Sequence, residues 1–95
     1  KSQINLVYAT EADLLNMALF GKTAKQWRDE NLDADGNIRD YASIEQLVVL
    51  SNLESLNGVL IQQGLPQNSR VRQLNAIAIT QMTSLMNNSN IKKLR

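Results

Sequence analysis

Two long runs of aliphatic residues at helical spacing, joined by a short connection, constrain the fold of this chain more than any other feature. The first run consists of Ile44, Leu47, Leu50, Leu53, Leu56, Val59 and Leu60. The second run consists of Val71, Leu74, Ile77, Ala78, Met82, Leu85 and Met86. Spacings of three and four residues place each run on one side of a helix. Ser43 and Gln46 form a capping box before the first run, and Gly64 stops it. The sequence therefore predicts helices over residues 44–63 and 67–87. Because the connection is short, both apolar sides are buried only if these helices pack antiparallel.

Two shorter helices are predicted before this hairpin. Thr10 is an N-cap residue followed by acidic residues in a first turn, which predicts a helix over residues 11–20. Thr23 and Gln26 form a second capping box, which predicts a helix over residues 24–31. The expected fold is all-α, with four helices, in which the two short N-terminal helices pack on the long antiparallel hairpin.

The composition excludes most catalytic chemistry. The 95 residues include no cysteine and no histidine, which excludes disulfides, thiolate metal sites and a Ser-His-Asp triad. No pair of carboxylates suggests acid–base work in a pocket, so we expect neither an enzyme nor a cofactor.

No apolar run is long enough to cross a membrane. A chain of this length fits one domain. Because the chain starts at Lys1 rather than at a methionine, we interpret residues 1–95 as a fragment of a longer protein. The absence of cysteine and of a signal segment favours the cytoplasm.

Basic residues in two regions are candidates for contact with DNA. Residues 11–31 combine a helix, a glycine turn and a basic helix, as helix-turn-helix units do, although Asp29 and Glu30 would repel phosphates. Residues 65–95 carry five cations and no anions, and an ordinary solvated face is the favoured interpretation there. The candidate nucleic-acid contacts are Lys22, Lys25, Gln26, Arg28, Arg70, Arg72, Lys92, Lys93 and Arg95.

Residues 31–42 nearly match a calcium-binding loop. Asn31, Asp33 and Asp35 occupy ligand positions of the helix–loop–helix motif, but its last position, which normally supplies a bidentate Glu, is Ala42. Asp, Asn and Gly also favour ordinary turns. We therefore interpret the segment as a turn between helices, with no metal, and keep calcium binding as the less favoured alternative.

The aromatic and asparagine residues are assigned structural roles. Trp27 lies at helical spacing from Ala24 and is interpreted as a core residue. Tyr8, Phe20 and Tyr41 are too scattered along the chain to predict a nucleic-acid surface. Three amides on the long helices are interpreted as surface residues, with buried amides that fix helix register as the alternative. These are Asn52, Asn57 and Asn75.

The long helices carry more apolar residues than one helix–helix contact can bury. Val48, Val49, Ile61 and Ile79 widen the apolar side of each helix. Each long helix therefore needs a second neighbour, either the short helices or another subunit.

The chain also resembles a known family. The strings MALFGKTAKQWRDEN, GNIRDYASIEQLVVLSNLESLN and QLNAIAITQM are similar to the C-terminal domain of bacterial and prophage KilA-N domain proteins. This similarity extends from about Tyr8 to Leu94. The resemblance implies a phage-related parent protein in which a separate DNA-binding KilA-N module precedes this region. It implies no role for any individual residue.

From the apolar surplus and this resemblance, we expect a non-enzymatic accessory domain. Its partner would be a second copy or another protein. DNA would be bound by the separate N-terminal module of the parent protein. The alternative is direct DNA binding through residues 11–31 or through the basic C-terminal face. No membrane and no small-molecule substrate is expected.

Overall fold

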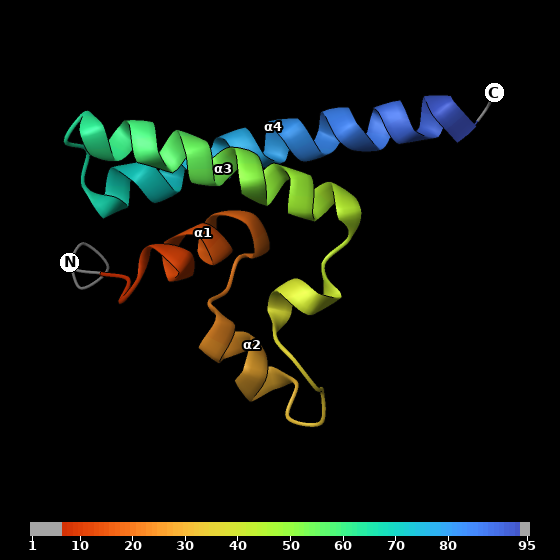
Figure 1. Ribbon diagram of the computed structural model, residues 1–95, viewed down its shortest axis with the longest axis horizontal. Coiled ribbons are helices and arrows are strands. Elements are labelled where there is room, and N and C mark those ends of the chain that lie inside the picture. The colour runs from red at the N-terminus through yellow and green to blue at the C-terminus, as the bar shows by residue number, and fades with distance from the viewer. Residues whose placement is uncertain (1–6, 94–95) are drawn as a thin grey trace.

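A computed structural model describes the backbone of residues 7–93 and the side chains of residues 7–87, and this part of the chain is helical without strands (Figure 1). The elements in chain order are α1 (Glu11–Phe20), α2 (Ala24–Glu30), η2 (Ile38–Tyr41), α3 (Ile44–Gln62) and α4 (Gln67–Lys93). The all-α prediction is confirmed, and the first three predicted helices agree with the structure to within one residue. The short 3₁₀ helix η2 was not predicted.

Capping groups fix where three of the helices begin. The side chain of Thr10 accepts a hydrogen bond from the backbone N–H of Asp13 at the start of α1. Capping boxes formed by Thr23 with Gln26 and by Ser43 with Gln46 open α2 and α3, as predicted. These contacts satisfy backbone N–H groups that have no partner within the helix.

The C-terminal helix is longer than the sequence pattern predicted. The expected end lay at Asn87, whereas α4 continues to Lys93. Asparagine lowers helix propensity only moderately, and neither glycine nor proline follows it. By contrast, Gly64 ends the preceding helical segment with a φ of +81°, a conformation that suits glycine.

The core lies where α1 crosses the α3–α4 hairpin. Figure 1 shows the two long helices side by side and antiparallel, with α1 against one side of the pair. The buried residues of this cluster are Tyr8, Leu14, Leu15, Ala18, Val49, Leu50, Leu53, Leu74 and Ala78. Aliphatic side chains from three helices meet here. The long helices therefore bury their apolar core sides against α1 as well as against each other.

The second short helix occupies a different place from the first. The prediction that short helices pack on the hairpin is confirmed for α1, whereas α2 makes its main contacts with η2 (Figure 1). None of the residues of α2 is buried, and Trp27 is its one large apolar side chain. The Trp27 ring lies 5.1 Å from the Tyr41 ring, centroid to centroid. Because α2 has so little apolar surface, this local aromatic contact is the main packing interaction that stabilises its position.

None of the described helices combines the length and the apolar character needed to cross a membrane.

Leu74 provides a test of the three-helix core. Its side chain is fully buried, so Leu74→Ala should lower the free energy of unfolding by about 2–5 kcal/mol. Ile79→Ala on the same helix is the control, because Ile79 is 61% exposed and its truncation should change stability by less than about 1 kcal/mol. Urea denaturation of both variants at one fixed protein concentration measures the difference. Equal losses would contradict the placement of Leu74 in the core.

Candidate functional site

The outer side of α3 carries a continuous stripe of exposed residues. Helical spacing places these residues directly opposite the buried Val49, Leu53 and Asn57. Its four large members are Ile44 at 77% exposure, Val59 at 48%, Val48 at 44% and Leu47 at 42%. We call this surface the α3 outer stripe. It consists of Ile44, Leu47, Val48, Ser51, Ser55, Gly58, Val59 and Gln62.

No residue of the α3 outer stripe is charged. The two carboxylates of α3, Glu45 and Glu54, lie on its flanks, and Glu54 pairs with Arg39 at 3.5 Å. Solvent-facing helix sides normally carry charged residues. A helix that is apolar on its core side and uncharged on its outer side is typical of one that is covered on both sides. The stripe is therefore the strongest candidate for an association surface in the described part of the chain.

The expected apolar surplus is only partly on the surface. Val49 is fully buried and belongs to the core. Val48 belongs to the α3 outer stripe, while Ile61 and Ile79 are 46% and 61% exposed at other places. The sequence indicated the surplus but not the stripe, because Ser51, Ser55 and Gly58 attract no notice individually. The signal that could have found it is the absence of charge at every position on the side of α3 opposite Val49, Leu53 and Asn57.

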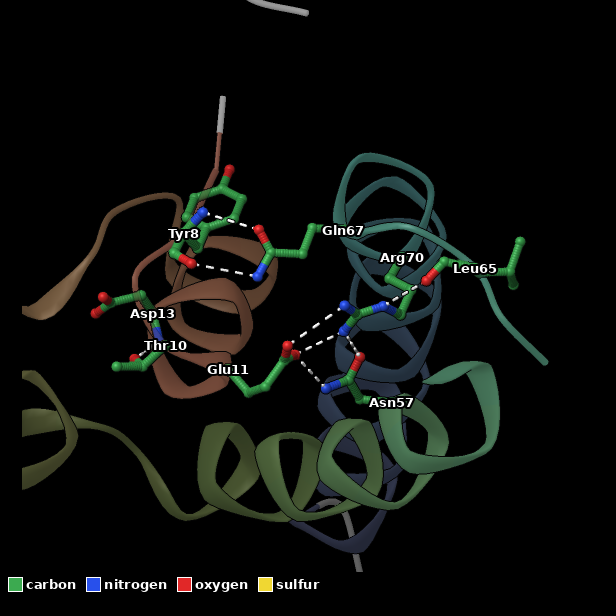
Figure 2. A network of polar contacts seen from close by, with 8 residues as sticks. All are labelled: Tyr8, Thr10, Glu11, Asp13, Asn57, Leu65, Gln67 and Arg70. Carbon is green, nitrogen blue, oxygen red and sulfur yellow. Dashed lines mark hydrogen bonds and ion pairs between the residues drawn. The ribbon is translucent and has the colours of Figure 1, made fainter. Parts of the chain in front are cut away.

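Arg70 is not a surface cation. The residue is 6% exposed, and its guanidinium sits between α1, α3 and α4 (Figure 2). Nη1 lies 2.6 Å from Glu11 Oε1 and donates to Asn57 Oδ1 at 2.9 Å, while Nε donates to the backbone carbonyl oxygen of Leu65 at 2.9 Å. Every partner is within the domain. The prediction of Arg70 as a candidate phosphate contact, or as part of a solvated basic face, is therefore wrong.

Asn57 is the second polar residue buried at this point. The residue is 4% exposed, and its Nδ2 donates to Glu11 Oε1 at 2.9 Å. The interpretation of Asn57 as a surface amide is therefore wrong, because the fold places it beside a buried cation that needs acceptors. Asn75 and Asn52 are exposed, but each joins two helices. Asn75 donates to the Ala18 carbonyl oxygen at 2.8 Å and Asn52 to Gln81 Oε1 at 3.0 Å.

Hydrogen bonds from its neighbours stabilise the charged form of Glu11. The side-chain hydrogen bond from Arg70 is the largest cause, followed by the one from Asn57, and together they hold the pKa of Glu11 below its usual value. Partial burial acts in the opposite direction but is outweighed. The carboxylate is 44% exposed, so water screens part of this interaction.

The predicted helix-turn-helix cations are mostly engaged with acids. Lys22 pairs with Glu30, and Lys25 pairs with Asp29 at 3.1 Å. Gln26 is engaged as well, since its Oε1 accepts the backbone N–H of Thr23 at 2.8 Å in the capping box of α2.

Two predicted cations keep an exposed side chain without an ion pair in the described structure. These are Arg28 on α2 and Arg72 on α4. The side chains of Lys92, Lys93 and Arg95 lie outside the described residues. A basic α2 surface therefore depends chiefly on Arg28, because the lysines beside it are paired with carboxylates of opposite charge.

Three of the four aromatic residues of the chain gather in one place. Phe20, Trp27 and Tyr41 line an open hollow of about 200 Å³ together with Lys22 and Gln46. Trp27 is half-buried here rather than in the main core. The spacing of these residues along the chain did not indicate this cluster, which forms because η2 brings Tyr41 back against α2. The lysine that lines the hollow is paired with Glu30, so the hollow offers little net positive charge to a phosphate.

The calcium-like segment forms a capped turn. Asn37 and Asp40 form a capping box at the start of η2, with the backbone N–H of Asn37 donating to Asp40 Oδ2 at 2.9 Å. The Tyr41 hydroxyl donates to the Asp35 carbonyl oxygen at 2.7 Å, and Gly36 adopts a φ of +87°. Among the described residues, no three acidic side chains gather at a position that could hold a metal ion.

The Glu11 interaction predicts a pH-dependent stability. Since its pKa is lowered in the folded state, its contribution is complete above the unfolded-state pKa of about 4.3 and is lost as pH falls through the folded value. The difference in unfolding free energy between the wild type and Glu11→Gln should be constant from neutral pH down to about 5 and shrink below about 4. Urea denaturation between pH 3 and 7 measures it. The Arg70→Met background is the control. In that background the change in unfolding free energy caused by Glu11→Gln should depend less on pH. An unchanged pH dependence would contradict the pairing of Glu11 with Arg70.

Comparison of this chain with family models, curated proteins and solved structures gave no match. Any functional assignment therefore depends on the sequence and on the geometry described above.

Proposed function

We propose that this chain is a non-enzymatic association domain of a phage-related, KilA-N type DNA-binding protein. The α3 outer stripe would be the surface through which it self-associates or docks a partner protein. The observation that carries this proposal is that every residue of the stripe is exposed and none is charged. Self-association is the form of the proposal that can be tested without knowing another partner.

The free energy of burial supports a covered stripe. Removing apolar surface from water stabilises an association by about 25 cal/mol per Å². The apolar members of the stripe lie on one straight face of a single helix, which is well suited to helix–helix packing. Because no charged group lies on that face, covering it requires no desolvation of an ionised side chain. These two properties together favour a protein surface as the occupant.

The resemblance to KilA-N proteins supports a role for association. Two DNA-binding modules that are joined through such a domain bind neighbouring DNA sites with an effective concentration that one module lacks. In this proposal the domain works in the cytoplasm, binds no cofactor and carries out no reaction. Its contribution to DNA binding would be indirect.

Sedimentation equilibrium at about 5–200 µM tests self-association, because this range covers dissociation constants that correspond to about −5 to −7 kcal/mol. The wild type should show a mass that increases with concentration. Val48→Lys should remain folded but monomeric, because it places a charge in the middle of the contact. Thr80→Lys is the matched control, since Thr80 is exposed on α4 outside the stripe, and it should associate like the wild type. A wild-type chain that is monomeric throughout this range would contradict self-association.

Direct DNA binding is the second candidate function. The observation in its favour is the exposed Arg28 of α2, which forms no ion pair within the described structure, next to the exposed Lys25. Binding through these residues should weaken steeply with salt.

Fluorescence anisotropy with duplex DNA between about 50 and 200 mM salt tests this candidate. Direct binding predicts that Arg28→Gln and Lys25→Gln each reduce the salt dependence by about one phosphate contact. Absence of binding at the lowest salt concentration would exclude this candidate.

A further inference from the structure

We infer that the occupant of the α3 outer stripe is a second copy of this chain, in a symmetric antiparallel pair of α3 helices centred on Ser51. In this arrangement Ile44 of each copy lies against the partner's Gly58. The inference rests on the proposed association function and specifies its partner and geometry.

The sizes of the residues along the stripe support an antiparallel pair. The large residues Ile44, Leu47 and Val48 lie before Ser51, and the small residues Ser55 and Gly58 follow it, with Val59 as the large apolar residue of the stripe beyond them. The spacing is the same on both sides, so a two-fold axis at Ser51 places Ile44 opposite the partner's Gly58 and Leu47 opposite the partner's Ser55. At these two positions large side chains would then meet small ones. A parallel pair would place large residues against large and small against small, which leaves gaps between the helices.

Gly58 supports the same arrangement independently of this pattern. It lies inside α3 with ordinary helical geometry, where glycine costs about 1 kcal/mol relative to alanine. Apart from its chain neighbours and the backbone of its own helix, no atom of the domain lies within 4 Å of the position that a Cβ would take there. Packing within one copy therefore gives no reason for a residue without a side chain. Close approach of a second helix does give one, because small residues let two helix backbones come together.

Charge also favours a second copy. The stripe has no charged residue that would meet its own equivalent across a two-fold axis. The chain has a net charge of only +1, so two copies repel each other weakly. A nucleic acid or a highly charged protein would find no complementary charge on this face. An uncharged face is complementary to itself, as a symmetric contact requires.

Cross-linking of single-cysteine variants tests the geometry, since the natural chain has no cysteine. Under mild oxidation at an associating concentration, Ser51→Cys should form a covalent dimer, because both sulfur atoms lie near the axis. Ile44→Cys alone should not, since the two equivalent positions are about 21 Å apart along the antiparallel helices. A mixture of Ile44→Cys and Gly58→Cys should cross-link. Self-cross-linking of Ile44→Cys would overturn the antiparallel arrangement.

Gly58→Leu tests the contact between Gly58 and the partner's Ile44 without cross-linking. The open space around Gly58 and the higher helix propensity of leucine should keep the folded monomer at least as stable as the wild type. The same change fills the space that receives Ile44, so association should weaken at least tenfold. Ala76→Leu is the control, because Ala76 is exposed on α4 outside the stripe, and it should associate normally.

The outcomes separate this inference from the proposed function. A wild-type chain that does not associate would overturn both. Association that is lost in Val48→Lys but unaffected in Gly58→Leu would support the α3 outer stripe and overturn the antiparallel pair.

Discussion

The buried guanidinium of Arg70 determines how the helices of this domain meet. It extends from α4 to Glu11 on α1 and Asn57 on α3, so one side chain joins all three helices of the core (Figure 2). Removing any one partner would leave a buried polar group without its hydrogen bond, which costs about 1–3 kcal/mol. A second contact strengthens the same junction, because Gln67 exchanges two hydrogen bonds with the backbone of Tyr8 just before α1. The position of α1 is therefore fixed by polar contacts as well as by apolar packing.

This junction also explains why one side of α3 stays uncovered. Since α1 is held against the side of the hairpin that carries Asn57, it cannot also cover the outer stripe. The other short helix does not cover it either, because α2 packs on η2 through Trp27 and Tyr41. The apolar residues left outside, above all Ile44 and Val59, remain exposed in the single chain. The proposed association gives them the neighbour that the domain itself does not supply.

The sequence predicts the helices well because the signals for them are local. The capping boxes at Thr23 and Ser43 and the stop at Gly64 each depend on a few neighbouring residues. Burial is harder to predict, since it depends on residues far apart in the chain. The sequence around Arg70 is typical of a solvated cation, because its partners Glu11 and Asn57 are distant in the chain and only the fold brings them together. The aromatic hollow was missed for the same reason, because only the fold brings Tyr41 to Trp27. Outward-facing residues such as Gly58 carry no local signal at all, and their meaning depends on what covers them.

The central claim is that the outer stripe of α3 is covered by the same stripe of a second copy. Isotope-filtered nuclear magnetic resonance on a mixture of labelled and unlabelled chains tests it directly, because such spectra detect only contacts between different copies. The account predicts contacts from the methyl groups of Ile44 in one copy to Gly58 and Ser55 in the other. Contacts between copies that avoid α3, or that join Ile44 to its own equivalent, would contradict it.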